Sequence, residues 1–329
     1  MNKIYKMLFS TTLITSVIIT ISSFSWMGMW IGLEMNLLSI IPMMNNKMNL
    51  FSSETSVKYL IVQALASSIL LMSIILFSMN WHNLSSTLMF NSSLLMKMGA
   101  APFHYWFPEI LEGLSWMNSL IMMTIQKIAP MIIFIMNSVL FTSIIILMSM
   151  LISGVLGINQ TSMRKLLAYS SINHISWMLA SLMYMKSLWL IYFSIYSIIS
   201  LNMVIFLNKF KIFYLKHLTS FSKNSMMKFF LMMNLFSLGG LPPFLGFFPK
   251  WIIIQILITN NSFTMSFLMI MMTLIVLFFY MRITLNSLMM INTQINFKLN
   301  TNHNTYWMIF FNSLSINSLI FYTLMINLL

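Results

Sequence analysis

Long apolar segments, separated by short polar stretches, follow one another through the 329 residues of this chain. A bilayer core about 30 Å thick is crossed by a helix of about 20 predominantly apolar residues. Windows of that length predict eleven membrane-crossing helices, at residues 4–22, 26–44, 56–79, 87–112, 117–137, 139–157, 166–184, 188–208, 229–258, 263–285 and 306–327. The pattern therefore predicts an all-α polytopic membrane protein with about 11 transmembrane helices in a single transmembrane domain, residues 1–329.

Two of these segments are interrupted in the same way. The stretch KMGAAPFHYWFPEILEG, at residues 97–113, shares five residues with a second stretch placed 141 positions later. The matched pairs are Gly99 with Gly240, Pro102 with Pro243, Phe103 with Phe244, Phe107 with Phe248, and Pro108 with Pro249. Glycine and proline at such positions break a helix. The fourth and ninth predicted helices are therefore expected to be broken helices.

The two broken helices predict an inverted repeat. Five crossings lead from the fourth predicted helix to the ninth, and an odd number makes the two helices run in opposite directions. We expect a first five-helix repeat at about residues 4–137, a second at about 139–285, and a C-terminal helix at 306–327. Paired interruptions in two halves of a membrane protein are typical of a transport site, because freed backbone groups at membrane depth need protein or water as partners.

The charge distribution predicts the orientation. Charged residues make up only 6% of the chain against 59% hydrophobic residues, and the formal net charge is +13. In the predicted topology, the side that carries the N-terminus receives thirteen Lys and Arg residues, and the other side receives only Lys186. Cationic loops mark the cytoplasmic side, which corresponds to the matrix in a mitochondrion. Because the cations lie between apolar segments, this interpretation is favoured over a nucleic-acid partner.

Four Lys and Glu residues lie in the interior of predicted spans, well away from the headgroups, namely Glu34, Lys97, Lys127 and Lys250. An ionisable side chain at the bilayer centre costs from about 2.5 to more than about 10 kcal/mol and by default indicates function. The alternatives are lysines that extend to the interface, and a static ion pair that only compensates a buried charge. Since burial disfavours the charged form of a lysine, we expect the lysines to bind and release a proton in a working cycle, with Glu34 as their counter-charge.

Two histidines are possible proton relays. His104 lies inside the first break, and His174 lies in the seventh predicted span. Histidine titrates near neutral pH, but a buried histidine is also commonly a hydrogen-bonded core residue, and both interpretations stay open. The chain has no cysteine, which excludes zinc–thiolate and cysteine-ligated iron–sulfur sites. No metal-ligand spacing or nucleotide-binding glycine loop is present either, so no cofactor or metal site is predicted in this chain.

Several segments together carry a family resemblance. They are MWIGLEMNLLSIIPM, SSETSVKYLIVQALAS, KMGAAPFHYWFPEILEGL, QKIAP, INQTSMRKLLAYSSINHISWML and LGGLPPFLGFFPKW. With these segments the chain resembles NADH dehydrogenase subunit 2, the mitochondrially encoded antiporter-like subunit of respiratory complex I. The resemblance runs from about residue 26 to residue 285, and the last 40 or so residues are less distinctive.

The resemblance implies a proton-pumping subunit in the membrane arm of complex I, with two inverted five-helix repeats, in the mitochondrial inner membrane. By motif position, the family's key glutamate falls on Glu34, its broken-helix lysine on Lys97, its central lysine on Lys127 and its distal-channel lysine on Lys250. Some related subunits carry a glutamate in the role of Lys250. The resemblance also implies partners in the other membrane-arm subunits and in membrane lipids, while other subunits bind NADH, FMN, iron–sulfur clusters and ubiquinone.

Three hypotheses follow for function. The first is a proton-translocating subunit of a redox-driven pump, which does not work alone. The second is a self-contained sodium/proton antiporter, but such exchangers commonly rely on buried aspartates and this chain contains no aspartate. The third is a structural spacer that carries inherited polar residues, for which a dry interior is expected.

Overall fold

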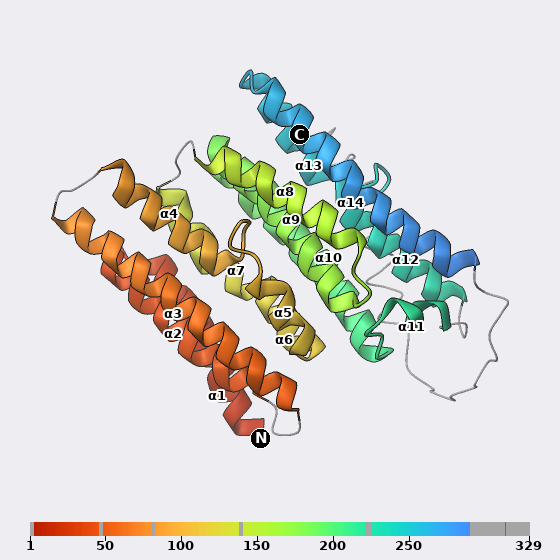
Figure 1. Ribbon diagram of the computed structural model, residues 1–329, viewed down its shortest axis with the longest axis horizontal. Helices are drawn as coiled ribbons and strands as arrows, with labels where there is room; N and C mark the ends of the chain where they lie inside the picture. The colour runs from red at the N-terminus through yellow and green to blue at the C-terminus, as the bar shows by residue number, and fades with distance from the viewer. Residues whose placement is uncertain are drawn as a thin grey trace. The chain divides into compact units, whose positions relative to one another are not determined.

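The computed structural model describes residues 3–45, 49–79, 83–137, 141–220, 225–289 and 313, and Figure 1 shows them as helices joined by short connections. Within this described part the only extended pairing is one isolated antiparallel bridge between Ser162 and Tyr214. The chain divides into two compact units, Met1–Ser149 and Met150–Leu329, with α8 (Thr142–Ile158) spanning the boundary. The expected all-α class is confirmed.

The first unit is a helical bundle. Its helices are α1 (Lys3–Ser22), α2 (Trp26–Met44), α3 (Leu50–Ser78), α4 (Leu84–Met98), α5 (Trp106–Gly113), α6 (Trp116–Met123) and α7 (Ile125–Met136). The helix α2 packs between α1 and α3, α3 packs against α4 and α5, and α7 contacts α1, α2 and α4. The candidate site residues of this unit therefore lie on helices that contact one another.

The second unit surrounds one polar helix. Its helices are α9 (Met163–Tyr184), α10 (Lys186–Lys209), α11 (Leu215–Ser220), α12 (Ser225–Gly239), α13 (Phe247–Thr259) and α14 (Phe263–Met289). Every residue of α9 from Leu166 to Leu182 is buried, and α10 and α13 pack against it. The polar residues of α9 are therefore core residues rather than part of a solvated face.

Both predicted breaks are present. Helix α4 ends at Met98 and α5 begins at Trp106, while α12 ends at Gly239 and α13 begins at Phe247. The 141-residue offset of the sequence motif is thus also the offset between the helix ends. The predicted span 117–137 is divided as well, since Thr124 (φ −116°, ψ −79°) separates the end of α6 at Met123 from the start of α7 at Ile125. Its proline, Pro130, disturbs the preceding turn because proline lacks an N–H and clashes with the carbonyl four residues earlier.

Six helices of the described residues have the length and hydropathy of a membrane span. They are Ile4–Ser22, Trp26–Met44, Leu50–Ser78, Trp116–Met136, Lys186–Lys209 and Phe263–Asn286. The two broken helices do not reach the length of a membrane span, because each of their halves is only eight to fifteen residues long. The expected helix at 306–327 lies outside the described residues. The total of eleven crossings therefore stays a prediction.

Candidate functional site

The first break is closed by hydrogen bonds from neighbouring side chains. Gly99 ends α4 in the left-handed conformation (φ 74°), which glycine adopts without a Cβ penalty. The Ala100 N–H donates to the Leu95 carbonyl at 3.0 Å, and the Trp106 indole donates to the Met96 carbonyl at 3.1 Å. Gln63 of α3 donates to the Lys97 carbonyl at 3.4 Å. The carbonyls of Leu95, Met96 and Lys97 at this helix end are therefore satisfied by protein groups, as membrane depth requires.

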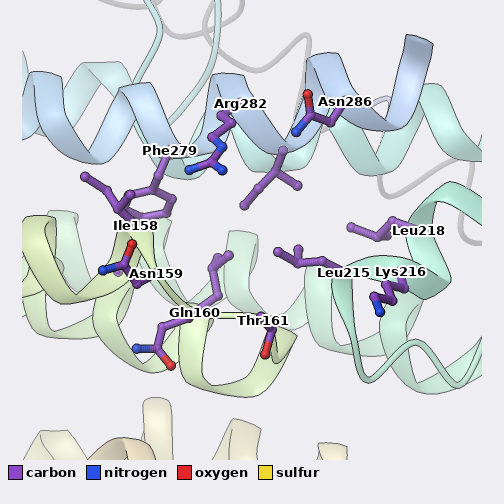
Figure 2. Close-up of a pocket in the computed structure, with 13 residues that line it drawn as sticks. Ile158, Asn159, Gln160, Thr161, Leu215, Lys216, Leu218, Phe279, Arg282 and Asn286 are labelled. Carbon is purple, nitrogen blue, oxygen red and sulfur yellow. The ribbon is translucent and has the colours of Figure 1, made fainter. Parts of the chain in front are cut away.

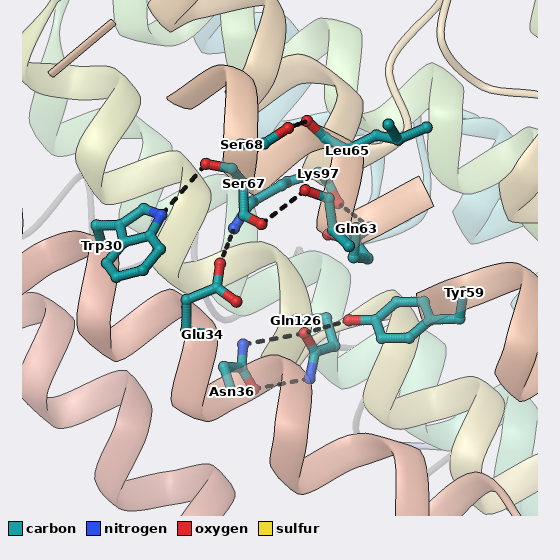
Figure 3. A network of polar contacts seen from close by, with 11 residues as sticks. Trp30, Glu34, Asn36, Tyr59, Gln63, Leu65, Ser67, Ser68, Lys97 and Gln126 are labelled. Atoms are coloured by element: carbon teal, nitrogen blue, oxygen red, sulfur yellow. Dashed lines mark hydrogen bonds and ion pairs between the residues drawn. The ribbon is translucent and has the colours of Figure 1, made fainter. Parts of the chain in front are cut away.

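Lys97 and Glu34 form an ion pair beside this break. The Nζ atom of Lys97, one residue before the end of α4, lies 3.7 Å from the Oε1 atom of Glu34 on α2, and Figure 3 shows the two side chains extending toward each other. The exposed fractions are 4% for the Lys97 side chain and 26% for Glu34. The lysine is therefore enclosed by protein, whereas the carboxylate retains partial access. The pair predicted from the two polar residues in apolar segments is present in the structure.

A second polar cluster fixes α2 to α7 and α3 close to this pair. Asn36 and Gln126 exchange two amide hydrogen bonds of 3.0 and 2.9 Å, and the Tyr59 hydroxyl donates to the same Gln126 oxygen at 3.3 Å (Figure 3). The sequence interpretation missed these residues, although Asn36 follows Glu34 by two positions and Gln126 immediately precedes Lys127. Paired amides make four polar atoms compatible with burial, so this cluster sets the relative position of helices that carry Glu34 and Lys127.

Lys127 lies in the first turn of α7, directly after the interruption at Thr124. Its residue is 1% exposed, and its amine stands 5.3 Å from the centre of the Phe107 ring, within the range of a cation–π contact. Phe107 belongs to α5, in the segment that follows the first break. The interior placement predicted for Lys127 is therefore found in the structure, and an aromatic face from the broken helix lies next to its amine.

Lys250 closes the second break. Its amine donates a hydrogen bond of 2.8 Å to the carbonyl of Gly239, the last residue of α12. Gly240 then takes the left-handed conformation (φ 84°), and a Cβ there would come within 2.8 Å of the Lys250 amine. Cations favour the carbonyl end of a helix. Lys250 is 5% exposed. Although it belongs to α13, its amine is thus bound at the C-terminal end of α12.

The two histidines have different surroundings. His104 is 1% exposed inside the first break, and its Nδ1 atom lies 3.2 Å from the Pro102 carbonyl, while its Nε2 atom has no hydrogen-bond partner among the described residues. His174 of α9 is 4% exposed, and its Nδ1 atom lies 2.8 Å from the Tyr192 hydroxyl on α10. Both rings are buried with at least one polar contact, an arrangement compatible with a core residue and with a relay.

Two further carboxylates, Glu54 and Glu109, lie at the surface of the first unit. Lys58 of α3 makes 3.1 Å ion pairs with Glu54 and with Glu109 of α5, and all three side chains are 45% to 59% exposed. The i, i+4 spacing of Glu54 and Lys58 on α3 favours their pair, whereas no local pattern in the sequence indicates the contact with Glu109. Among the residues that the structure describes, no group of three or more His, Asp or Glu side chains could hold a metal ion.

The chain matches one family model over most of its length. The model is described as "NADH:quinone oxidoreductase/Mrp antiporter, TM" and matches residues 23–277. Among solved structures, the fold is similar to a chain of respiratory complex I from Thermus thermophilus, with a TM-score of 0.84 at 18% identity, covering 97% of this chain and 79% of that one. A chain of the Mrp complex from Dietzia gives a TM-score of 0.72 at 16% identity, covering 89% of this chain and 61% of that one. The fold and the matched domain thus define an antiporter-type membrane subunit.

Curated relatives narrow the class to one family. The chain is 48% identical over 305 residues to NADH-ubiquinone oxidoreductase chain 2 of Anopheles gambiae, which covers 90% of this chain and 89% of the relative. It is 47% identical over 328 residues to the Aedes aegypti protein of the same name, covering 97% and 93%, and 43% identical over 320 residues to that of Mus musculus, covering 92% and 91%. The chain belongs to the NADH-ubiquinone oxidoreductase chain 2 family.

Proposed function

We propose that the chain is the antiporter-like subunit 2 of respiratory complex I, and that it translocates protons across the mitochondrial inner membrane. In this proposal the proton path is a row formed by Lys97, Lys127 and Lys250, driven by quinone reduction elsewhere in the complex. The relatives carry the name of an NADH-ubiquinone oxidoreductase chain, which supports membership of that enzyme. The observation that supports the mechanism most is the Lys97–Glu34 ion pair, enclosed beside a broken helix.

The ion pair can act as a switch for proton binding. A charged Lys97 amine is stabilised by the Glu34 carboxylate at 3.7 Å, an attraction of about 4 kcal/mol at an effective dielectric constant of about 20. If the carboxylate moves away, the enclosed amine loses that stabilisation and its charged form is disfavoured by burial. Glu34 would therefore couple proton release from Lys97 to a charge change in a neighbouring subunit. The Glu34 side chain is 26% exposed, so protein does not enclose it on every side.

Lys127 and Lys250 would also bind and release protons according to their surroundings. Lys127 has the aromatic face of Phe107 beside its amine, and this cation–π contact would favour its charged form. Lys250 can exchange its bond to the Gly239 carbonyl for a proton acceptor. Protons would enter from the matrix side to Lys97 and Lys127, pass to Lys250 and leave on the opposite side, with His104 and His174 as relays.

The architecture assumed in this proposal is the one expected from the sequence: eleven crossings in two inverted five-helix repeats, at about 4–137 and 139–285, with a C-terminal helix at 306–327. The equal 141-residue offset of the two motifs and of the helix ends supports it. The N-terminus would face the matrix. NADH, FMN, iron–sulfur clusters and ubiquinone would be bound by partner subunits, and the chain would work only within the complex, surrounded by inner-membrane lipids.

A neutral substitution of the central lysine tests the proposal. Lys127→Met keeps an unbranched side chain only one atom shorter and removes its proton site, so the assembled complex should form in normal amount while its proton-to-electron ratio falls. Lys186→Met is the matched control, since Lys186 is an exposed lysine at the start of α10. A normal proton-to-electron ratio in the Lys127→Met complex would overturn the proposal. Sodium-dependent exchange by the isolated chain in liposomes would instead support an antiporter.

A further inference from the structure

A buried tyrosine of the second unit lies between the second break and the polar helix α9. Tyr280 of α14 is only 1% exposed. A Cβ at Gly239 would lie 3.4 Å from its ring, so the ring packs against the residue whose carbonyl accepts the hydrogen bond from Lys250. At its other end, the Tyr280 hydroxyl approaches that of Ser170 on α9. One side chain therefore extends from the break that carries Lys250 to the polar helix.

The Tyr280 hydroxyl is a buried polar group that has no hydrogen-bond partner among the residues that the structure describes. The nearby Ser170 hydroxyl donates its own proton to the Leu167 carbonyl at 2.8 Å. Buried hydroxyl groups are normally paired, and an unpaired one makes a fold less stable than an apolar group of the same shape would. The packing of α14 therefore accounts for an aromatic ring at this position, but not for its hydroxyl.

The cavity at the end of α14, which Figure 2 shows, does not supply a partner for this hydroxyl. The cavity has a volume of about 470 Å³, and the residues of α14 that line it are Phe279, Arg282, Ile283 and Asn286. Tyr280 is not among the lining residues, since neighbouring residues of an α-helix point in different directions. The hydroxyl of Tyr280 therefore faces the interior of the second unit.

On α9 the hydroxyl belongs to the same buried cluster as His174. Ser170 and His174 are one helical turn apart, so they lie on one face of α9. The Nδ1 atom of His174 lies 2.8 Å from the Tyr192 hydroxyl, and the centre of the Tyr196 ring lies 4.8 Å from that of the imidazole. Tyr196 in turn interacts electrostatically with Tyr280. The cluster thus combines three phenol hydroxyls with an imidazole, the side chain that most readily gains and loses a proton near neutral pH.

We propose that the Tyr280 hydroxyl is a further member of the proton path and passes protons between His174 and Lys250. When a protonated His174 gives up a proton, the hydroxyl oxygen accepts one proton and releases its own, so one O–H bond forms as another breaks. The Lys250 amine takes the released proton and becomes an ammonium group. A water molecule on either side of the hydroxyl completes the hydrogen bonds. This inference rests on the lysine row of the proposed function.

Removal of the hydroxyl alone tests this role. Tyr280→Phe keeps the ring against Gly239, and Tyr184→Phe is the matched control, because Tyr184 is an exposed tyrosine at the end of α9. The assembled complexes are compared by thermal stability and by proton-to-electron ratio, with Lys250→Met as the reference. Tyr280→Phe should stay close to the wild type in thermal stability, because no hydrogen bond to protein is lost. Its proton-to-electron ratio should fall to that of Lys250→Met, whereas Tyr184→Phe should retain both wild-type values.

The comparison with Lys250→Met separates this inference from the proposed function. A normal ratio in Tyr280→Phe together with a low ratio in Lys250→Met would exclude Tyr280 from the path and leave the lysine row standing. Normal ratios in both variants would refute the lysine row as well. A low ratio in Tyr280→Phe alone would contradict proton transfer to Lys250. A low ratio accompanied by a clear loss of thermal stability would assign the hydroxyl a structural role and overturn the inference.

Discussion

Replacing Glu34 by glutamine removes one charge and leaves the shape of the side chain almost unchanged. The Lys97 amine, with a side chain only 4% exposed, then loses the carboxylate that lies 3.7 Å away. At an effective dielectric constant of about 20 this attraction is about 4 kcal/mol, and breaking a buried pair costs about 3 to 5 kcal/mol. Since Glu34 is 26% exposed, the pair is not fully enclosed and the lower part of this range applies. We expect Glu34→Gln to destabilise the first unit by about 2 to 4 kcal/mol.

The assay combines thermal stability of the assembled complex with its proton-to-electron ratio. Glu34→Gln should lower both, whereas Glu109→Gln, which removes an exposed carboxylate paired to Lys58, should change both far less. In Glu34→Gln/Lys97→Met the uncompensated charge is gone, so stability should recover while proton translocation stays low. Equal effects of Glu34→Gln and Glu109→Gln, or normal translocation by the double variant, would refute the reasoning.

Three further predictions concern the breaks and the amide cluster. Gly240→Ala should destabilise the second unit by about 1 to 2 kcal/mol because its backbone is left-handed. The cost should be higher still, because the new Cβ would lie 2.8 Å from the Lys250 amine. A thermal stability no lower than that of Gly239→Ala would contradict this. Lys250→Met should lower the free energy of unfolding by about 1 to 3 kcal/mol, because the Gly239 carbonyl loses its donor. It should also lower the proton-to-electron ratio. No change in either quantity would count against the assigned contact. Asn36→Leu should cost about 1 to 3 kcal/mol because the Gln126 amide loses its partner, and Asn36→Leu/Gln126→Leu/Tyr59→Phe, which removes every member of the cluster including the hydroxyl that donates to Gln126, should be more stable than Asn36→Leu, which a denaturation comparison would check.

The helix positions and the first ion pair could be predicted from the sequence because both depend on local composition. The predicted span 26–44 coincides with α2, and the Gly and Pro residues placed both breaks correctly, because these residue types act on the backbone of their own turn. Glu34 is the only acid in the interior of a predicted span, since Glu109 and Glu112 lie at the end of theirs. Its pairing with a buried lysine therefore followed from the cost of leaving either charge alone.

The partners of the other polar groups could not be predicted. Asn36 and Gln126 are ninety residues apart, and an amide pair leaves no periodic signal in the sequence. Lys250 is bound to a backbone carbonyl, and every residue offers a carbonyl, so the sequence could not single out Gly239. The interruption at Thr124 lies six residues before Pro130. In this span the proline therefore indicates that the helix is disturbed, but not the residue at which it divides.

A density map of the assembled complex at a resolution that places water molecules tests the proton path most directly. The account predicts ordered waters that link the amines of Lys97, Lys127 and Lys250 to one another and to the polar groups at the two breaks. Amines separated by packed hydrocarbon side chains without intervening water would contradict it, and would favour a chain whose buried lysines serve only the structure.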